Sequence, residues 1–382
     1  MTLRDLNPQV ESYATQVVER VIAAAQSAGA SDIHFETLPG LVQIRLRISG
    51  RLVEYGDCPD GHTTKILARI KALARLITYR SDIPQEGRFV LAHPPLEARV
   101  GTLPTLHGER AVIRLVNRTA ENWLPAQLGL PSEIESRLVS SLARPSGVIL
   151  VAGPAGAGKT TTAYSGLRYL QQHARYPRSL VTLEDPIESE VAGVSQSQIN
   201  PSTGYDWADG LKALLRQDPE VMLVGEIRDP ATAAVVFQAA MTGQLVITTM
   251  HARTAADALR RLLDMQVSPH HLRSVLELLV CQRLISRTCP CRRAGGSPEN
   301  LAEKTPETCV VCHGSGYHGR SLLVEMLPTI DGELAKALVQ DADTSTIEKL
   351  GQEQGMRTLA ERGAECISRG EVESLELARH LG

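Results

Sequence analysis

Eight consecutive residues, 153–160, carry the pattern of a phosphate-binding loop. Its glycines let backbone N–H groups turn inward around phosphate oxygens, Lys159 can neutralise β- and γ-phosphate charge, and the Thr160 hydroxyl can ligate Mg²⁺. A glycine-rich turn that arose by chance would need neither the apolar run before this loop nor the helix-like stretch after it, so their presence favours a phosphate-binding loop. The sequence therefore predicts a site for a nucleoside triphosphate and Mg²⁺. The expected nucleotide-binding residues are Gly153, Pro154, Ala155, Gly156, Ala157, Gly158, Lys159, Thr160 and Thr161.

Acidic residues follow two further apolar strands. The first strand ends in Glu184 and Asp185, and the second ends in Gly225 and Glu226. Ligands of open parallel sheets bind at the carboxyl edge, where a carboxylate can orient the water that attacks a phosphate. We therefore expect Glu226, Glu184 and Glu188 to be catalytic; a solvated strand end is the alternative for either acidic pair alone.

A third apolar strand, 244–250, delivers His251 to the same edge. A lone histidine is more often structural than chemical, but a position beside the predicted γ-phosphate favours a role as sensor or positioning group. Glycine at 225 stands where such strands usually carry a metal-linked aspartate. Magnesium coordination beyond Thr160 is thus expected to pass through water to Glu226, or to Glu184 and Asp185.

Four of the seven cysteines are clustered. Cys289 and Cys291 form one pair, and Cys309 and Cys312 form the other. Clustered thiols in a reducing compartment are candidates for metal binding rather than for disulfides, and an unmetallated loop is the alternative. The isolated cysteines at 58, 281 and 366 are interpreted as small buried hydrophobic residues.

The bulk properties exclude some classes of protein. A chain of 382 residues is too long for one ordinary core, which predicts two or three domains. The formal net charge of −3 argues against a general nucleic-acid binder. The sequence shows neither a signal-peptide pattern nor an apolar run of membrane-spanning length, so we expect a cytoplasmic protein.

Periodicity predicts the elements of a first domain. Residues 41–55 alternate between apolar and polar, as in a β-hairpin, with arginines on the outer face. Residues 63–79 have helical spacing, and 97–116 return to strands around a glycine turn. Residues 1–118 are therefore expected to form a small α+β domain.

The rest of the chain predicts an α/β domain. A polar connector with two prolines, 119–131, is the expected linker and hinge. In residues 132–382, strands alternate with helices, which predicts a parallel sheet covered by helices. Within it, 281–325 form the cysteine-bearing segment, and 328–382 have the periodicity of a helical tail.

Taken in order, these motifs resemble the Walker A, Asp box, Walker B and His box of the type II/IV secretion ATPases, the superfamily of general secretion and type IV pilus motors. The glycine at 225 is usual there. Residues 30–36, 84–88 and 102–110 resemble the same family, so the resemblance runs from about residue 30 nearly to the C-terminus. It implies a PAS-like first domain and a RecA-like P-loop ATPase domain with a zinc-binding excursion.

The cysteines indicate which members of this family the chain resembles most. Assembly motors of this family carry two cysteine pairs before a Gly-Tyr-x-Gly-Arg segment, which stands here at 316–320, whereas retraction motors lack the cysteines. An assembly motor is implied, with Zn²⁺ held by Cys289, Cys291, Cys309 and Cys312. The first pair is C-x-C instead of C-x-x-C, which strains tetrahedral ligation, so His313 is a substitute ligand.

The resemblance also implies how such a motor works. Arg88, Arg99 and Arg110 lie in matching segments and are candidates to compensate phosphate charge. A homo-oligomer, in this family a hexamer, would hydrolyse ATP at the inner face of the cytoplasmic membrane. It would act on an inner-membrane platform protein that assembles a type IV pilus or a type II secretion pseudopilus, with membrane association only through partners and without direct nucleic-acid binding. The alternatives within the motor class are a pilus retraction ATPase and a competence, DNA-uptake or conjugative pilus motor. From other classes, they are a nucleic-acid translocase, because RecA-like sheets also drive DNA motors, and a regulatory subunit without turnover, suggested by Gln244 where a histidine is usual.

Overall fold

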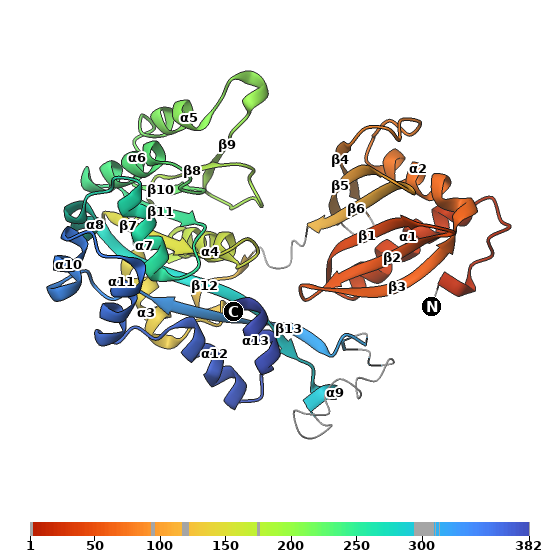
Figure 1. The fold of residues 1–382 in the computed structure, drawn as a ribbon. Helices are drawn as coiled ribbons and strands as arrows, with labels where there is room; N and C mark the ends of the chain where they lie inside the picture. Colours follow the sequence, from red (N-terminus) through yellow and green to blue (C-terminus); the bar gives the residue numbers. More distant parts are fainter. Residues whose placement is uncertain are drawn as a thin grey trace. The chain divides into compact units, whose positions relative to one another are not determined.

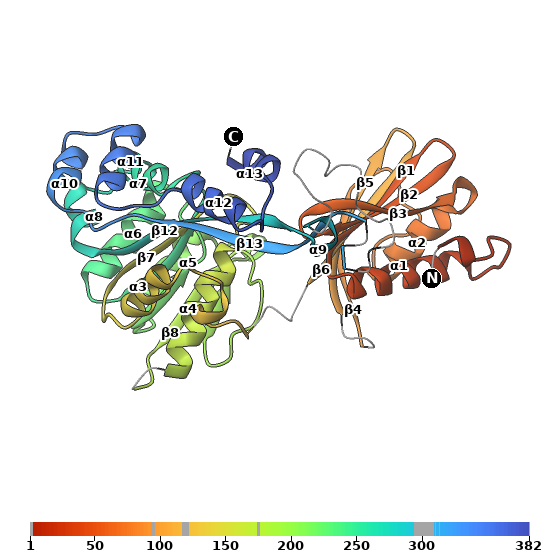
Figure 2. The ribbon, with the colours of Figure 1, turned by 90° about the horizontal axis from the view of Figure 1, so that it is seen from below.

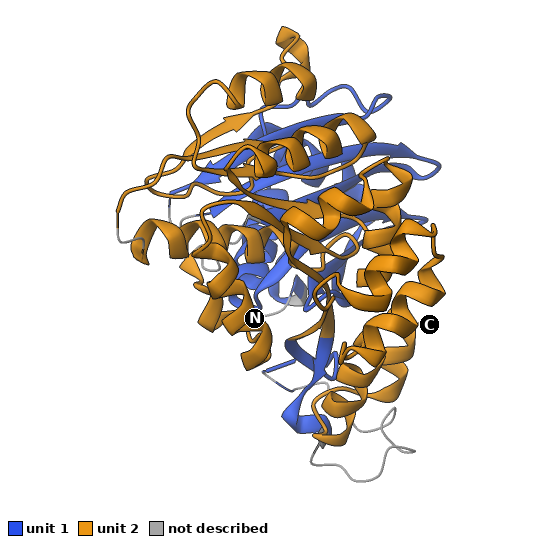
Figure 3. Cartoon of the chain, turned by 90° about the vertical axis from the view of Figure 1, so that its left-hand side faces the viewer, with its two compact units in different colours: residues 1–118, 286–320 blue, residues 119–285, 321–382 orange. Residues whose placement is uncertain are grey.

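The computed structural model describes residues 3–92, 96–116, 122–173, 176–293, 309, 311–312 and 314–381. Its internal contacts divide the chain into two compact units, coloured separately in Figure 3. Unit 1 comprises Met1–Arg118 and Ser286–Arg320, and unit 2 comprises Thr119–Ile285 and Ser321–Gly382. Residues 117–121, which include the first three residues of the expected linker at 119–131, lie outside the described residues.

Unit 1 is built on a six-stranded sheet in which neighbouring strands run antiparallel (Figure 1). Its strands and main helices are β1 (Ala30–Leu38), β2 (Leu41–Ile48), β3 (Arg51–Pro59), β4 (Gln85–Leu91), β5 (Leu96–Thr105), β6 (Gly108–Val116), α1 (Tyr13–Ser27) and α2 (Thr63–Leu73). The strand order is β3-β2-β1-β6-β5-β4. Alternate residues of β2 are buried in a core shared with α1 and α2, so the arginines between them lie on the opposite face. The predicted α+β organisation is confirmed.

Helix α2 ends earlier than the sequence predicts. The apolar spacing continues to residue 79, but the helix stops at Leu73, and Arg75 adopts a left-handed φ of 58°. The chain then turns against β4, where a Cβ atom at Gly87 would lie 2.6 Å from the carbonyl oxygen of Ala74. Tertiary packing on a glycine thus ends a helix that the local pattern would continue.

Unit 2 contains a seven-stranded sheet in the order β13-β12-β7-β11-β10-β8-β9 (Figure 1). Its strands are β7 (Gly147–Ala152), β8 (Leu180–Glu184), β9 (Ser195–Gln198), β10 (Val221–Val224), β11 (Leu245–Met250), β12 (Leu276–Thr288) and β13 (Tyr317–Met326). The pairs from β12 through β7, β11, β10 and β8 to β9 are all parallel. The predicted parallel sheet is confirmed.

Helices cover both faces of this sheet (Figure 2). They are α3 (Ser132–Leu142), α4 (Lys159–His173), α5 (Trp207–Leu214), α6 (Pro230–Met241), α7 (Ala255–Asp264) and α8 (Pro269–Val275). Ile149 and Val151 of β7 pack with α3 and α4, whereas Val148 and Leu150 pack with α6, α7 and α8. Burial on both faces explains why β7 is a continuous apolar run instead of an alternating one.

The C-terminal part of unit 2 is helical, as predicted for residues 328–382. Its helices are α10 (Gly332–Val339), α11 (Thr344–Glu353), α12 (Leu359–Ser368) and α13 (Ser374–Leu381). The buried carboxylate of Glu325 accepts hydrogen bonds from the backbone N–H of Ala255 at 2.5 Å and of Leu359 at 2.9 Å, at the first residues of α7 and α12. Negative charge is stabilised at helix N-termini, so Glu325 ties this tail to the sheet. Among the helices that the structure describes, none combines the length and the hydropathy needed to cross a membrane.

The segment around the cysteines makes its contacts with unit 1. The Ser286 hydroxyl donates to the carbonyl of Ser49 at 3.2 Å, and the N–H of Gly319 donates to the Ser49 hydroxyl at 3.1 Å. The Arg51 guanidinium lies 3.6 Å from the centre of the Tyr317 ring. Residues 286–320, which include helix α9 (Pro290–Arg293), are therefore grouped with unit 1, whereas we expected 281–325 within the second domain.

We predict that Glu109→Ala lowers the free energy of unfolding of unit 1 by about 3 to 5 kcal/mol. Lys71 and Glu109 form an ion pair at 2.5 Å with side chains that are 1% and 5% exposed, so the substitution leaves a buried, unpaired ammonium group. Urea denaturation followed by circular dichroism measures the loss. The double variant Lys71→Met with Glu109→Leu removes both charges and should recover most of it; unchanged stability of Glu109→Ala would contradict the prediction.

Candidate active site

A cavity of about 240 Å³ opens at the carboxyl edge of the unit 2 sheet. The strand register explains its position, because Ala152 of β7 lies beside Met250 of β11 and Cys281 of β12. The residues that follow Ala152 and Met250 therefore leave the sheet side by side, next to Gln282, which continues β12. The cavity is lined by Ala155, Lys159, Thr160, Ala163, Tyr164, Glu184, Asp185, Pro186, Glu188, Trp207, Leu223, Gly225, Glu226, Arg228, Thr249 and His251.

The glycine-rich loop connects β7 to α4 as the motif requires. A Cβ atom at Gly153 would lie 2.6 Å from the backbone oxygen of Gln282, and the φ of 150° there is rare for other residues, so only glycine fits. Lys159, Thr160 and Thr161 form the first turn of α4. Their N–H groups have no preceding helical turn to bond, which makes this helix end suited to an anion.

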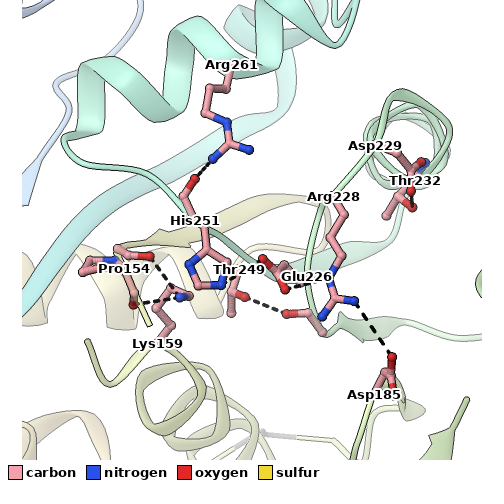
Figure 4. A network of polar contacts seen from close by, with 12 residues as sticks. Pro154, Lys159, Asp185, Glu226, Arg228, Asp229, Thr232, Thr249, His251 and Arg261 are labelled. Atoms are coloured by element: carbon pink, nitrogen blue, oxygen red, sulfur yellow. Dashed lines mark hydrogen bonds and ion pairs between the residues drawn. The ribbon is translucent and has the colours of Figure 1, made fainter. Parts of the chain in front are cut away.

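The Lys159 ammonium is held by the loop itself. Its Nζ donates to the carbonyls of Gly153 at 2.9 Å and Pro154 at 3.0 Å (Figure 4). Burial lowers the pKa of Lys159 from its usual value, while the nearby Glu226 carboxylate opposes this shift. The group is therefore a partly desolvated cation at one wall of the cavity.

Glu226 is placed between two basic side chains. Its side chain is 16% exposed; one oxygen lies 3.3 Å from Nε2 of His251, and the other accepts from Nε of Arg228 at 2.9 Å (Figure 4). Arg228 also lies 3.9 Å from Asp185. Each carboxylate oxygen can accept more than one hydrogen bond, so Glu226 keeps capacity for a water molecule in the cavity.

The two other candidate glutamates lie in different environments. Glu184 is 3% exposed and accepts hydrogen bonds from the Tyr164 hydroxyl, from Thr182 at 2.6 Å and from Gln196 at 3.1 Å. Its oxygens are thus largely occupied by the protein. Glu188 lines the same cavity with an exposed side chain, so of these two it is the one accessible to a ligand or water.

The glycine at position 225 has a packing reason. A Cβ atom there would lie 3.3 Å from the backbone oxygen of Leu183 and 3.5 Å from the Trp207 ring. The first of these contacts is tight, and a side chain there would require the end of β8 to shift slightly, whereas the second is an ordinary van der Waals distance. The close approach of β8 and β10 therefore favours a small residue at this place, and the next residue, Glu226, carries the acidic group.

Position 244 is remote from this chemistry. Gln244 precedes β11, and His251 follows it, so six extended residues of about 3.3 Å each separate them. The Gln244 side chain accepts a hydrogen bond from Thr242 at 2.8 Å. Gln244 thus lies at the opposite end of β11 from the cavity, and the alternative of a subunit without turnover, which rested on this residue, stays a prediction.

Sequence reasoning did not single out three residues that shape the site: Tyr164, Arg228 and Gln282. Tyr164 donates to Glu184 and accepts from the N–H of Glu188 at 3.2 Å, and burial raises its pKa. The sequence around Tyr164 and Gln282 does not indicate that they lie at the site, because their contacts depend on how helix α4 and strand β12 pack. Arg228 stood within a motif, but its partners become visible only in three dimensions.

The three candidate arginines lie in unit 1. Arg88 and Arg99 are exposed and lie directly opposite each other on the neighbouring strands β4 and β5. Arg99 in turn lies opposite Arg114 of β6. Arg110 lies 3.0 Å from Glu36 and 3.1 Å from Nδ1 of His34. Like charges directly opposite each other destabilise a sheet. In the row of Arg88, Arg99 and Arg114, Asp32 compensates Arg114 at 2.9 Å, which leaves Arg88 and Arg99 as the facing like charges. Arg114 was not expected from the sequence.

The four clustered cysteines come together in space. Their sulfur atoms all lie within 4.8 Å of one another, with Cys289 and Cys309 at 3.9 Å and Cys291 and Cys312 at 3.6 Å. Tetrahedral zinc with Zn–S bonds of about 2.3 Å requires sulfur atoms about 3.8 Å apart. Backbone N–H groups of Cys312 and Val311 lower the pKa of Cys309 to about 6, which favours its thiolate. The C-x-C spacing thus permits a four-sulfur set; His313 lies outside the described residues.

Comparisons with known proteins find secretion and pilus proteins that are similar to this chain. The sequence model of the family described as type II/IV secretion system protein matches residues 9–379. The type II secretion system protein E of Xanthomonas campestris pv. campestris is 35% identical over 394 residues, covering 99% of this chain and 68% of the relative. The type IV pilus assembly ATPase PilB of Thermus thermophilus is 35% identical over 370 residues, covering 92% of this chain and 41% of that protein.

A solved structure shares the fold. The X-ray structure of the Legionella pneumophila ATPase DotB superposes with a TM-score of 0.70 and covers 95% of this chain and 94% of that chain. The sequence identity is 22%, so this likeness concerns the fold alone.

Proposed function

This chain belongs to the type II/IV secretion system protein family, and from that membership we propose that it is a P-loop ATPase that drives assembly of a type IV pilus or a type II secretion pseudopilus. The observation that carries the proposal is the convergence of Lys159, Thr160, Glu226 and His251 on one cavity. A loop with helix-end N–H groups, a cation and an adjacent carboxylate is the set of groups that phosphoryl transfer to water requires. The relatives named as a secretion protein and as a pilus assembly ATPase support the assembly role.

Each residue has a separate task in this mechanism. The backbone N–H groups of the loop and of the first turn of α4 bind the β- and γ-phosphates, and Lys159 leaves the loop carbonyls to neutralise their charge. The Thr160 hydroxyl would hold Mg²⁺, which supplies charge neutralisation on the phosphate oxygens. Glu226 orients the attacking water, with Arg228 fixing one of its oxygens. His251 contacts the same carboxylate and is placed to report the loss of the γ-phosphate.

The tertiary contacts distinguish the roles of the acidic residues. Glu184 acts through its hydrogen bonds with Tyr164 and Gln196, and so positions the wall of the cavity. Glu188 would be the second carboxylate that can bind a water molecule in the cavity or contact Mg²⁺ through water. This assignment refines the expectation that Glu184, Glu188 and Glu226 act alike.

At the level of the assembly, we propose a homo-oligomer, a hexamer, located in the cytoplasm at the inner face of the cytoplasmic membrane. Hydrolysis would move the two units about the linker at 119–131 and transmit this motion to an inner-membrane platform protein. Arg88, Arg99 and Arg110 would supply positive charge to the triphosphate. The four-cysteine cluster favours assembly over retraction, because the resemblance implies that the retraction motors of this family lack these cysteines, and we propose that the cluster holds Zn²⁺.

We predict that Lys159→Ala abolishes ATP turnover and filament assembly without unfolding the protein, since it removes the cation of the phosphate site. Glu226→Gln should still bind ATP but hydrolyse it about 10²- to 10⁴-fold more slowly. Phosphate release and equilibrium nucleotide binding measure the two effects. Lys212→Ala, which alters an exposed lysine on α5, is the control. Filament assembly by Lys159→Ala would refute the motor assignment, and normal turnover by Glu226→Gln would shift the water-orienting role to Glu188 or Glu184.

For the arginines, we predict that Arg88→Ala and Arg99→Ala each lower kcat for ATP by roughly 10- to 10³-fold, because an arginine at a transferring phosphate is worth that much or more. Steady-state phosphate release by the assembled oligomer is the measurement. Arg69→Ala removes a half-buried arginine of the same unit that pairs with Glu19 at 3.3 Å, and it should turn over ATP as wild type does. Equal rates for all three variants would exclude the arginine row from catalysis.

For the cysteines, we predict about one zinc ion per chain in purified protein, measured by mass spectrometry of the metal. Cys309→Ser should lose most of the metal, because a hydroxyl does not replace a thiolate ligand. Cys366→Ala changes a buried cysteine outside the cluster and should retain it. Zinc-free wild-type protein from zinc-replete cells would contradict the assignment.

A further inference from the structure

Gln282 occupies a buried position against the phosphate-binding loop. It lies in β12, beside β7, and is 0% exposed. Because Cys281 pairs with Ala152 in the parallel register, Gln282 of β12 lies at the level at which Gly153 leaves the end of β7. A side chain from a strand far along the chain thus reaches the loop.

The Gln282 amide makes two hydrogen bonds there. Its Nε2 donates to the carbonyl oxygen of Ala157 at 2.8 Å, and its Oε1 accepts from the Thr162 hydroxyl at 3.1 Å. A carbonyl can only accept, so the contact with Ala157 fixes which end of the amide carries the donor. One side chain therefore joins the loop to the first turns of α4.

This hydrogen bond has a consequence for anion binding. The C=O of Ala157 and the N–H of Gly158 belong to one trans peptide plane, in which they point in opposite directions. Holding the carbonyl toward Gln282 directs the N–H of Gly158 away from it. A loop that binds phosphate must present N–H groups and turn its carbonyl oxygens away, because these oxygens repel the anion.

The glycines of the loop are packed against the same residue. A Cβ atom at Gly153 would lie 2.6 Å from the backbone oxygen of Gln282, and one at Gly158 would lie 3.2 Å from its Nε2. Gln282 thus contacts the loop at both ends and in its final peptide. A buried glutamine could satisfy its own hydrogen bonds without lying so close to the glycines of the loop.

We propose that Gln282 is a positioning residue for phosphate binding, which holds the Ala157 carbonyl outward so that the Gly158 N–H is presented to the nucleotide. This inference rests on the proposed nucleotide site and adds a residue from β12 to it. It predicts a loss of nucleotide affinity that is separate from any loss of stability.

The test uses the full chain and measures equilibrium binding of ADP with Mg²⁺, beside thermal unfolding without nucleotide. Gln282→Leu removes both hydrogen bonds at similar volume and should weaken ADP binding roughly 10- to 100-fold at any pH. Gln282→Glu should bind as weakly at about pH 8, but its deficit relative to wild type should shrink toward about pH 6. A buried carboxyl has a raised pKa, and once protonated it can donate to Ala157 again. Gln238→Glu, the same change at an exposed glutamine of α6, is the matched control and should bind as wild type.

Wild-type ADP affinity in both Gln282 variants, whatever their melting temperatures, would overturn the proposal. So would a deficit in Gln282→Glu that does not change with pH. If neither variant folds, Thr162→Val carries the test, because it frees the amide to rotate and should weaken binding by a smaller factor; unchanged affinity then refutes the inference. Wild-type protein that binds no nucleotide would refute the proposed function as well, which distinguishes the two failures.

Discussion

The parallel pairing of β7 with β11 and β12 is the constraint on which the site depends. It sets Ala152, Met250 and Cys281 at one level of the sheet, so that the phosphate-binding loop and His251 leave it together beside Gln282 of β12. The register is in turn fixed by burial, because β7 is apolar on both faces and packs against helices on each side. A slip of this strand would separate the loop from all its partners.

Around that edge, similar side chains acquire different functions from their surroundings. Glu184 is enclosed by Tyr164, Thr182 and Gln196 and becomes part of the framework, while Glu226 faces the cavity between Arg228 and His251. Buried polar groups that are fully hydrogen-bonded make a structure rigid. A carboxylate with spare acceptor capacity beside a ligand cavity can instead take part in chemistry.

Buried charged and polar side chains also connect the outer parts of the chain to the sheet. Glu325 joins the N-termini of α7 and α12, and the Arg283 guanidinium donates to the Arg253 carbonyl at 2.7 Å in the segment between His251 and α7. Both residues belong to the pair β12 and β13, which also flanks the cysteine cluster. The strands that support the catalytic edge are thus the ones between which the four thiols stand in the sequence.

The sequence by itself determined the local features: the loop at 153–160, the apolar strands that end in Glu184, Glu226 and His251, the α+β and α/β organisation, and the four-cysteine set. These follow from residue type and short-range spacing, which one chain shows directly. Only the tertiary structure decided that α2 stops at Leu73, that Glu184 is occupied while Glu188 is open, that Gly225 lies close against the end of β8, and that Gln282 contacts the loop. Each of these depends on contacts between residues distant along the chain, and the packing that brings them together leaves no periodic pattern in the sequence.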